Sequence, residues 1–250
     1  MTRVIIGGIT GHTGIAVARH IDSAPDLDLV AAVGNRSVGR DIADILGSGH
    51  SGRHVYPDVK SAVVAHPAEV YVDFTAPKAA ENTLPIATEL GLNLIVGTTG
   101  ISEQTLEIVS RNLVSRGRFG VISSNFSLGA FVLARSLRLL ANLFGSANIE
   151  ILESHNVSKV DHPSGTALYL RQLVEASEDH PIPVHWIRVS GHVSRHEIRI
   201  HEGSQTLSIV HDVTSPDAFA SGVLYALRNY RGQVGVYPDL ASFVSVGKDG

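Results

Sequence analysis

A glycine-rich turn near the start of the chain constrains the fold more than any other feature of the sequence. Gly8, Gly11 and Gly14 follow a short apolar run (Val-Ile-Ile), and the residues after them have helical spacing. A second apolar run, LDLVAAVG, ends near Gly34. A strand, a turn, a helix and a second strand in this order form a βαβ unit, whose two strands are parallel. We therefore expect a parallel sheet in this part of the chain.

The same turn predicts a nucleotide site. Backbone N–H groups at a helix N-terminus can face a pyrophosphate, and glycines remove the side chains that would block its approach. A tight turn packed between a helix and a sheet would need glycines too, so this structural alternative stays open. The turn residues that we expect to contact a dinucleotide are Gly8, Thr10, Gly11, His12, Thr13 and Gly14.

The end of the second apolar run indicates which dinucleotide is bound. An acidic residue at this place commonly binds the ribose hydroxyls of NAD. Here Asn35 is neutral, and the guanidinium of Arg36 suits a ribose phosphate. We expect NADPH to be preferred, with NADH possible; the alternative is that Arg36 is an ordinary solvated loop charge.

The alternation of strands and helices continues to about residue 124. Apolar strands are expected at Val70–Phe74, Leu94–Val96 and Phe119–Ile122, with helices after Pro77 and after Ser102. This pattern predicts an α/β fold in which residues 1–124 form a dinucleotide-binding domain with a Rossmann-type parallel sheet.

From residue 125 the pattern changes. FSLGAFVLARSLRLLANLF has helical spacing, a strand is expected at Asn148–Leu152, and period-two alternation begins beyond Pro183 around a plausible EGSQ hairpin turn. We expect residues 125–212 to form a second, α+β substrate-binding and oligomerisation domain on a mixed or antiparallel sheet. Residues 213–250, helical over Asp217–Tyr230, are expected to return to the first domain.

Composition narrows the classes of partner. The 250 residues carry a formal net charge of -4 without a basic run, which argues against nucleic-acid binding. There is no cysteine, so disulfides and thiolate metal sites are excluded. No apolar run approaches the ~18 residues of a membrane span, and the opening residues lack a signal core. We expect a cytoplasmic enzyme that acts on a small molecule, with no nucleic-acid or membrane partner.

Polar residues crowd the segment ESHNVSKVDHPSGTA, between an expected strand and an expected helix. Ser164, Gly165 and Thr166 open the helix, so their hydroxyl and N–H groups, with the charge of Lys159, predict a pocket for a carboxylate. An imidazole such as that of His155 can donate or relay a proton near neutral pH. The alternative is a helix N-cap beside a surface lysine and a core histidine.

This segment resembles the signature of the 4-hydroxy-tetrahydrodipicolinate reductases, also called dihydrodipicolinate reductases. Further motifs of that family follow the same order in the chain: Asp73–Thr75 before Pro77, Gly97–Gly100, Ser124–Ser127, and the tail PIPVHWIRVSG. The resemblance implies an NAD(P)H-dependent oxidoreductase that reduces a cyclic, imine-type dicarboxylate. The reaction implied is that of 4-hydroxy-tetrahydrodipicolinate to tetrahydrodipicolinate, in lysine and diaminopimelate biosynthesis.

The resemblance also implies roles for individual residues and a homotetramer formed through the sheet of the second domain. His155 and Lys159 would be the catalytic pair. Substrate would be bound by Asn156, Ser164, Gly165, Thr166 and Thr99. The remaining cofactor contacts would come from Phe74, Thr75, Gly97, Thr98, Thr99, Ser124, Asn125, Phe126 and Phe219.

The sequence departs from the family's pattern in and near the expected site. The departures are Asn156 in place of the second histidine, His162 in place of alanine, His12-Thr13 in place of Arg-Met, Ala76 and Pro216 where arginines are frequent, and a shorter stretch between Arg171 and Pro183. They keep two alternatives open: a divergent paralogue that reduces another cyclic imine in specialised metabolism, and a non-catalytic dinucleotide-binding protein.

Two further patterns contain residue types found in functional sites. The chain has thirteen histidines, but His196 and His201 would point to opposite faces of one strand, so we expect no metal site. Ser164, His155 and Asp161 are the residue types of a hydrolase triad, but the G-x-S-x-G turn of such enzymes is missing.

Overall fold

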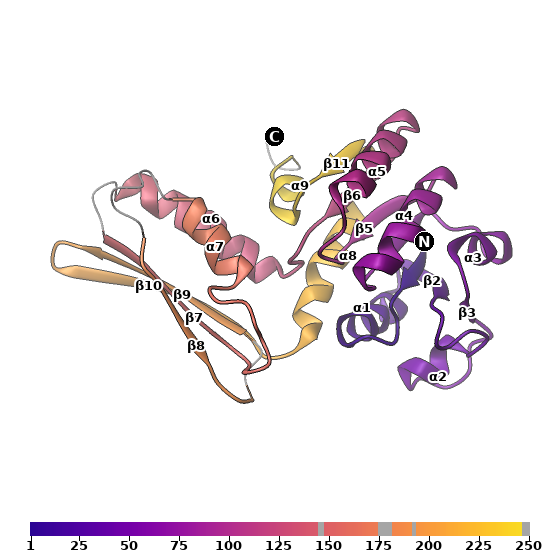
Figure 1. Cartoon of the computed structure of the whole chain (residues 1–250), viewed down its shortest axis with the longest axis horizontal. Helices are drawn as coiled ribbons and strands as arrows, with labels where there is room; N and C mark the ends of the chain where they lie inside the picture. Colours follow the sequence, from indigo (N-terminus) through magenta and orange to yellow (C-terminus); the bar gives the residue numbers. More distant parts are fainter. Residues whose placement is uncertain (145–147, 175–181, 192–193, 247–250) are drawn as a thin grey trace. The chain divides into compact units, whose positions relative to one another are not determined.

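The computed structural model describes residues 1–144, 148–174, 182–191 and 194–246 (Figure 1). The chain forms two compact units, Met1–Phe126 with Phe219–Gly250, and Ser127–Ala218. The division expected from the sequence places the boundaries after residues 124 and 212. None of the helices in the described parts of the chain is long and apolar enough to cross a membrane.

The first unit is built on a seven-stranded sheet of order β11-β6-β5-β4-β1-β2-β3, in which every neighbouring pair is parallel. This confirms the predicted Rossmann-type sheet. Its strands are β1 (Thr2–Gly7), β2 (Leu27–Val33), β3 (Val55–Tyr56), β4 (Val70–Asp73), β5 (Asn93–Val96), β6 (Phe119–Ile122) and β11 (Gly235–Tyr237). Its helices are α1 (His12–Ser23), α2 (Ile42–Leu46), α3 (Val59–Ala65), α4 (Pro77–Glu89), α5 (Glu103–Ser115), α8 (Ala220–Asn229) and α9 (Leu240–Val246).

Local chemistry explains where these elements lie. Strands β4 and β5 are buried along their whole length, as expected for parallel strands that are covered on both faces. Pro77 occupies the first turn of α4, where its missing N–H costs nothing. The hydroxyl of Ser102 accepts a hydrogen bond from the N–H of Thr105 and so caps α5, which confirms the predicted helix start.

The second unit is a four-stranded sheet of order β10-β9-β7-β8, with two helices on one of its faces (Figure 1). β7 and β8 are parallel and the other pairs antiparallel, so the sheet is mixed, as predicted. β9 and β10 are joined at Gly203, whose φ of 57° favours glycine, which confirms the EGSQ hairpin. The elements are α6 (Leu128–Leu143), β7 (Asn148–His155), α7 (Gly165–Gln172), β8 (Val184–Arg188), β9 (Ser194–Glu202) and β10 (Gln205–Val213). A 3-10 turn at Pro216–Phe219 leads into α8.

The two faces of this second sheet differ in chemistry. On the helix face, Ile151 of β7 and Ile198 and Ile200 of β9 pack in a core with α6 and α7. Alternate residues such as Glu150 and Glu197 form ion pairs on the opposite face, here called the outer face. The short stretch expected between Arg171 and Pro183 falls largely on residues 175–181, which lie outside the described residues.

Candidate functional site

The glycine turn connects β1 to α1, with Gly11 as the N-cap of the helix. Gly8 has a φ of 85°, and a Cβ on it would collide with the backbone carbonyl of Phe74. A Cβ on Gly14 would collide with the carbonyl of Gly8, so tight packing explains both glycines. A Cβ on Gly11 would stand at an ordinary 3.4 Å from the carbonyl oxygen of Gly8. Packing therefore does not explain why position 11 is glycine. A ligand that approaches the exposed backbone of Gly11 would explain it.

A hollow of about 290 Å³ lies beside this turn, at the carboxyl ends of the parallel strands. Glycine at position 97 leaves room for the ring of Phe74, with which a Cβ would collide. Phe74 in turn packs edge-on against Phe126, with ring centroids 5.9 Å apart. The hollow is lined by Gly11, His12, Thr13, Gly14, Phe74, Thr75, Pro77, Gly97, Thr98 and Thr99. Nine of the expected contact residues, from the turn and from the ends of β4 and β5, thus meet in one place, together with Pro77.

Asp73, at the end of β4, holds two of the threonines that line the hollow. Its buried carboxylate accepts hydrogen bonds from the hydroxyls of Thr98 (2.5 Å) and Thr75 (2.8 Å) through the same oxygen, Oδ1. The N–H of Thr75 donates to the hydroxyl of Thr98 as well (2.9 Å). These bonds fix the two strand ends relative to each other, so the shape of the hollow is set before any ligand enters.

The other residues expected to bind cofactor do not line this hollow. Asn35 and Arg36 are exposed after β2, and Arg36 has no hydrogen bond or ion pair with any other described residue. Gly8 and Thr10 lie in the turn itself. Ser124 and Asn125 follow β6, Phe126 is buried, and Phe219 is half-buried before α8.

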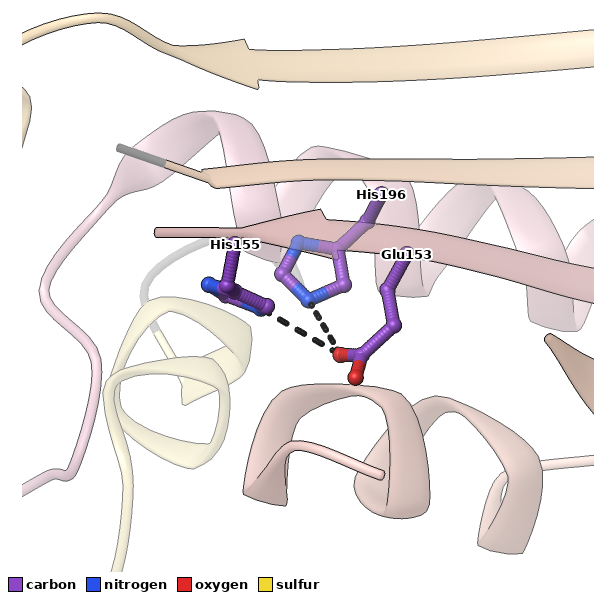
Figure 2. A group of neighbouring side chains, drawn as sticks. All are labelled: Glu153, His155 and His196. Carbon is purple, nitrogen blue, oxygen red and sulfur yellow. Dashed lines mark ion pairs between the residues drawn. The ribbon is translucent and has the colours of Figure 1, made fainter. Parts of the chain in front are cut away.

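In the second unit, Glu153 and His155 lie two residues apart on β7 and share its helix face (Figure 2). The carboxylate Oε2 of Glu153 is 3.2 Å from Nε2 of His155 and 3.7 Å from Nε2 of His196, on β9. All three side chains are buried, and neither Oε2 of Glu153 nor Nε2 of His155 has a hydrogen-bond partner among the described residues. The two imidazole rings meet edge to face, 5.2 Å apart.

The second oxygen of Glu153, Oε1, binds two further elements. It accepts a hydrogen bond from the N–H of Ser164 at the start of α7 (3.0 Å) and from Nη2 of Arg188 at the end of β8 (3.2 Å). Burial alone would raise the pKa of Glu153, but the contacts with His155, Ser164 and Arg188 lower it to about 2. The carboxylate is therefore ionised at neutral pH. Burial, and then the neighbouring His155, lower the pKa of His196 to about 4, so that imidazole is neutral.

Lys159 lies in the loop between β7 and α7, and its charge is paired. Nζ of Lys159 is 2.9 Å from Oδ1 of Asp161. This contact, with a weaker one from the N–H of Gly165, lowers the pKa of the Asp161 carboxyl. Asp161 thus pairs with the lysine that the sequence predicts for a substrate carboxylate.

The predicted substrate residues differ in what they bind within the protein. Ser164 is a buried N-cap whose hydroxyl accepts from the N–H of Ala167 (3.2 Å), as the alternative interpretation of this segment expects. Asn156 closes a turn, since its Oδ1 accepts from the N–H (3.0 Å) and the hydroxyl (2.9 Å) of Ser158. Gly165 is exposed and Thr166 half-buried. His162 is exposed, and its ring packs at a tilt against Trp186, with centroids 4.5 Å apart; Trp186 in turn contacts the guanidinium of Arg188.

The hydrolase triad is not formed. The hydroxyl of Ser164 is 3.3 Å from Nε2 of His196, and the carboxylate of Asp161 pairs with Lys159 rather than with His155. His196 is buried while His201 is exposed, which confirms that those two histidines point to opposite faces.

Glu153, His155 and His196 have potential metal-ligand atoms that all lie within 4.8 Å of one another. A divalent cation could use these three atoms, although no metal site is predicted from the sequence. The carboxylate already has the guanidinium of Arg188 as a counter-ion, so its charge is balanced without a metal.

Sequence reasoning missed the roles of three residues in this cluster. Glu153 could have been found, because two residues apart on a strand means the same face as His155. Arg188 and His196 could not, because their proximity depends on strand register: His155 is opposite Arg188, and Glu153 is opposite His196.

The parallel sheet with its glycine turn and the hollow at the strand ends define a dinucleotide-binding protein of the Rossmann type. The family described as dihydrodipicolinate reductase matches with its N-terminal part over residues 2–126 and with its C-terminal part over residues 129–241. The chain belongs to the dihydrodipicolinate reductase family, which confirms the resemblance seen in the sequence.

Individual relatives support the same assignment. The chain is 33% identical to the 4-hydroxy-tetrahydrodipicolinate reductase of Moorella thermoacetica, over 94% of each chain. It is 32% identical to that of Methanopyrus kandleri, over 91% of each. Among solved structures, a dipicolinate-bound dihydrodipicolinate reductase from Paenisporosarcina sp. TG-14 superposes with a TM-score of 0.83, at 23% identity, over 96% of this chain and 98% of that one. An amine dehydrogenase from Mycobacterium smegmatis shares the fold, with a TM-score of 0.71 at 14% identity over 94% of each chain.

Proposed function

We propose that this chain reduces 4-hydroxy-tetrahydrodipicolinate to tetrahydrodipicolinate in lysine and diaminopimelate biosynthesis, with NADPH as the preferred reductant. The observation that carries the proposal is the match of both halves of the chain to one reductase family. The retention of His155 and Lys159 beside the start of α7 supports turnover over a purely cofactor-binding role.

The first unit would hold the cofactor. The N–H groups of the turn at the start of α1 suit the pyrophosphate, and Arg36 is free to bind a ribose phosphate. The hollow suits the nicotinamide, which supplies the hydride when bound. The residues proposed for these contacts are those expected from the sequence: Gly8, Thr10, Gly11, His12, Thr13, Gly14, Asn35, Arg36, Phe74, Thr75, Gly97, Thr98, Thr99, Ser124, Asn125, Phe126 and Phe219.

The second unit would hold the substrate. The ammonium of Lys159, once Asp161 has left it, and the helix start at Gly165 and Thr166 would bind a substrate carboxylate. His155 would donate or relay the proton that the reaction needs besides the hydride. Asn156, Ser164 and Thr99 complete the proposed substrate contacts; in Ser164 the N–H is already bound to Glu153, so its contribution would come through the position of the helix.

Oxidation of NADPH in the presence of freshly generated 4-hydroxy-tetrahydrodipicolinate, beside a panel of other cyclic imines, tests the proposal. We expect turnover with the dicarboxylate to exceed that with every other imine of the panel. Preferred reduction of a monocarboxylate imine would identify a divergent paralogue instead. Cofactor binding without turnover of any imine would identify a dinucleotide-binding protein.

The preference for NADPH has its own test. A charge-assisted hydrogen bond is worth about 1.5–3 kcal/mol, so Arg36→Ala should weaken NADPH binding by roughly ten- to a hundredfold while NADH binding changes little. Fluorescence titration of both cofactors measures this. Equal affinities in the unmutated protein, or an unchanged ratio in the variant, would mean that Arg36 is only a loop charge.

We also propose that the chain is a cytoplasmic homotetramer assembled through the outer face of the second sheet. Ile187 and Val210 are exposed among the ion pairs of that face, as expected of a surface that a second copy covers. Light scattering coupled to gel filtration measures the mass of the assembly, and a monomer at micromolar concentration would contradict the proposal.

A further inference from the structure

We infer that Glu153 is a positioning residue, whose buried carboxylate fixes His155, the start of α7 and, through Arg188, the loop that carries Lys159. The inference rests on the proposed function and adds to it a residue that orders the substrate site without touching substrate. Glu153 is suited to this because its side chain is fully buried and three different elements converge on it.

The carboxylate of Glu153 contacts groups on both of its oxygens; Figure 2 shows its two histidine neighbours. One oxygen faces the imidazole of His155 at 3.2 Å, and the other accepts from the N–H of Ser164 at 3.0 Å and from Arg188 at 3.2 Å. These groups come from β7, the start of α7 and β8. The orientation of the proposed proton donor and the position of the helix start therefore depend on the same buried anion.

Arg188 connects Glu153 to the loop. Its Nη2 donates to the backbone carbonyl of Asp161 (2.6 Å) as well as to Glu153, and its Nε donates to the carbonyl of Lys159 (3.3 Å). Arg188 is thus fixed on one side by Glu153 and holds the loop backbone on the other. Without the carboxylate, the guanidinium loses its counter-ion and the loop loses the support that places Lys159.

An amide of the same shape cannot replace the carboxylate. A carboxylate accepts at both oxygens, whereas glutamine accepts at one atom and donates at the other. Whichever way the amide turns, its NH2 group would face either His155 or the donors of Ser164 and Arg188. Glu153→Gln therefore breaks part of the network while it preserves side-chain volume.

Glu150 provides a matched control on the same strand. It lies on the outer face, and its carboxylate also contacts two histidines, His185 and His201, each at 3.2 Å, and one arginine, Arg199, at 3.7 Å. Glu150→Gln makes the same chemical change to a similar set of neighbours, outside the proposed substrate site. Because Glu150 lies on the proposed assembly surface, light scattering checks that this variant keeps the mass of the unmutated protein.

The experiment compares both variants with the unmutated protein in thermal unfolding, NADPH titration, dipicolinate titration and steady-state kinetics. For Glu153→Gln we expect kcat to fall by about a hundredfold and dipicolinate to bind at least about tenfold more weakly, with NADPH affinity within about twofold. For Glu150→Gln we expect kcat, dipicolinate affinity and NADPH affinity to stay within about threefold of the unmutated protein. Arg188→Lys should weaken dipicolinate binding by about tenfold and change kcat less, because the contact of Glu153 with His155 remains.

Three results would overturn the inference. The first is dipicolinate binding and turnover in Glu153→Gln within threefold of the unmutated protein. The second is an equal loss of NADPH affinity, which would show a general folding defect. The third is stoichiometric zinc in the purified protein that Glu153→Gln loses, which would make the cluster a metal site. Failure of the proposed function would show instead as absence of turnover in the unmutated protein, and the two titrations do not depend on turnover.

Discussion

Strand β7 carries two glutamates with nearly the same neighbours and very different surroundings. Glu150 and Glu153 each contact two histidines and one arginine at 3.2–3.7 Å. The side chain of Glu150 is 25% exposed on the outer face, and that of Glu153 is fully buried on the helix face. The contact lists alone would suggest equal importance.

The difference between the faces lies in the solvent. Ion pairs at a surface are screened by water and contribute about 0–1 kcal/mol. Removal of one partner from a buried pair costs about 3–5 kcal/mol, because the remaining charge has no solvent to replace its partner. In a single chain the outer face can therefore change its charges at little cost, whereas the helix face is fixed by one carboxylate. A change near the Glu153 cluster should therefore have a larger effect than the same change on the outer face. Because the outer face is also the proposed assembly surface, an outer-face variant serves as a control when its mass in solution matches that of the unmutated protein.

Lys159→Ala should have the largest effect. If Lys159 binds a substrate carboxylate, its loss costs about 2–5 kcal/mol, which is a fall in kcat/KM of several tens to several thousandfold. The thermal midpoint and NADPH affinity should stay unchanged. Arg199→Ala on the outer face, also a removed cation, should keep kcat/KM within about threefold. Near-normal activity of Lys159→Ala would disprove the carboxylate pocket.

His196 and His201, on opposite faces of β9, should contribute differently to the loss of stability at low pH. The pKa of His196 is lowered from 6.5 to about 4, so the unfolded chain binds a proton in a pH range where the folded protein does not. Stability therefore decreases as pH falls from about 6.5 to about 4. Glu153, with its pKa lowered to about 2, adds a further loss that begins below about pH 4.5.

Thermal midpoints measured across this range test that expectation. His196→Gln should cost about 1–3 kcal/mol at pH 7 through its lost contacts, yet show a shallower decline between pH 6.5 and 5. His201→Gln on the outer face should show the decline of the unmutated protein. Parallel curves for all three proteins would mean that His196 does not stay neutral in the folded state.

The smallest effect concerns two exposed aspartates. Asp161 pairs with Lys159 at 2.9 Å, and Asp212 pairs with Arg195 on the outer face at 2.7 Å. Asp161 pairs with the lysine that would bind substrate and so competes with the substrate carboxylate. Asp161→Asn should therefore lower KM by about two- to fivefold at constant kcat, which corresponds to the free energy of a surface ion pair. Asp212→Asn should leave KM unchanged. A higher KM in Asp161→Asn would show that Asp161 assists binding rather than competes with it.

The sequence predicted those parts of the fold that local pattern determines. Strands β4 to β6 consist mainly of buried apolar residues, and the β9–β10 hairpin has its glycine at the turn. β3 and β11 were not predicted, because strands of two and three residues carry no readable period and depend on their neighbours for pairing.

The candidate site divides in the same way. The glycine turn, Lys159 and His155 were identified from short motifs whose chemistry is local. Glu153, Arg188 and His196 come together only through the register of β7 with β8 and β9, which spacing along the chain does not specify. Ser164 shows the converse limit: its residue type fits both a ligand contact and an N-cap, and only its position in the fold reveals the N-cap.

The way Arg188 holds the loop has a consequence for how this protein can diverge. Arg188 binds main-chain carbonyls of the loop, and every amino acid offers the same carbonyl. Substitutions along residues 156–163 can therefore accumulate without loosening the attachment of the loop. This explains how Asn156 and His162 can differ from the family's pattern in a chain that retains the surrounding framework. For the engineer, the same segment offers positions at which substrate preference can be varied while the scaffold beneath stays constant.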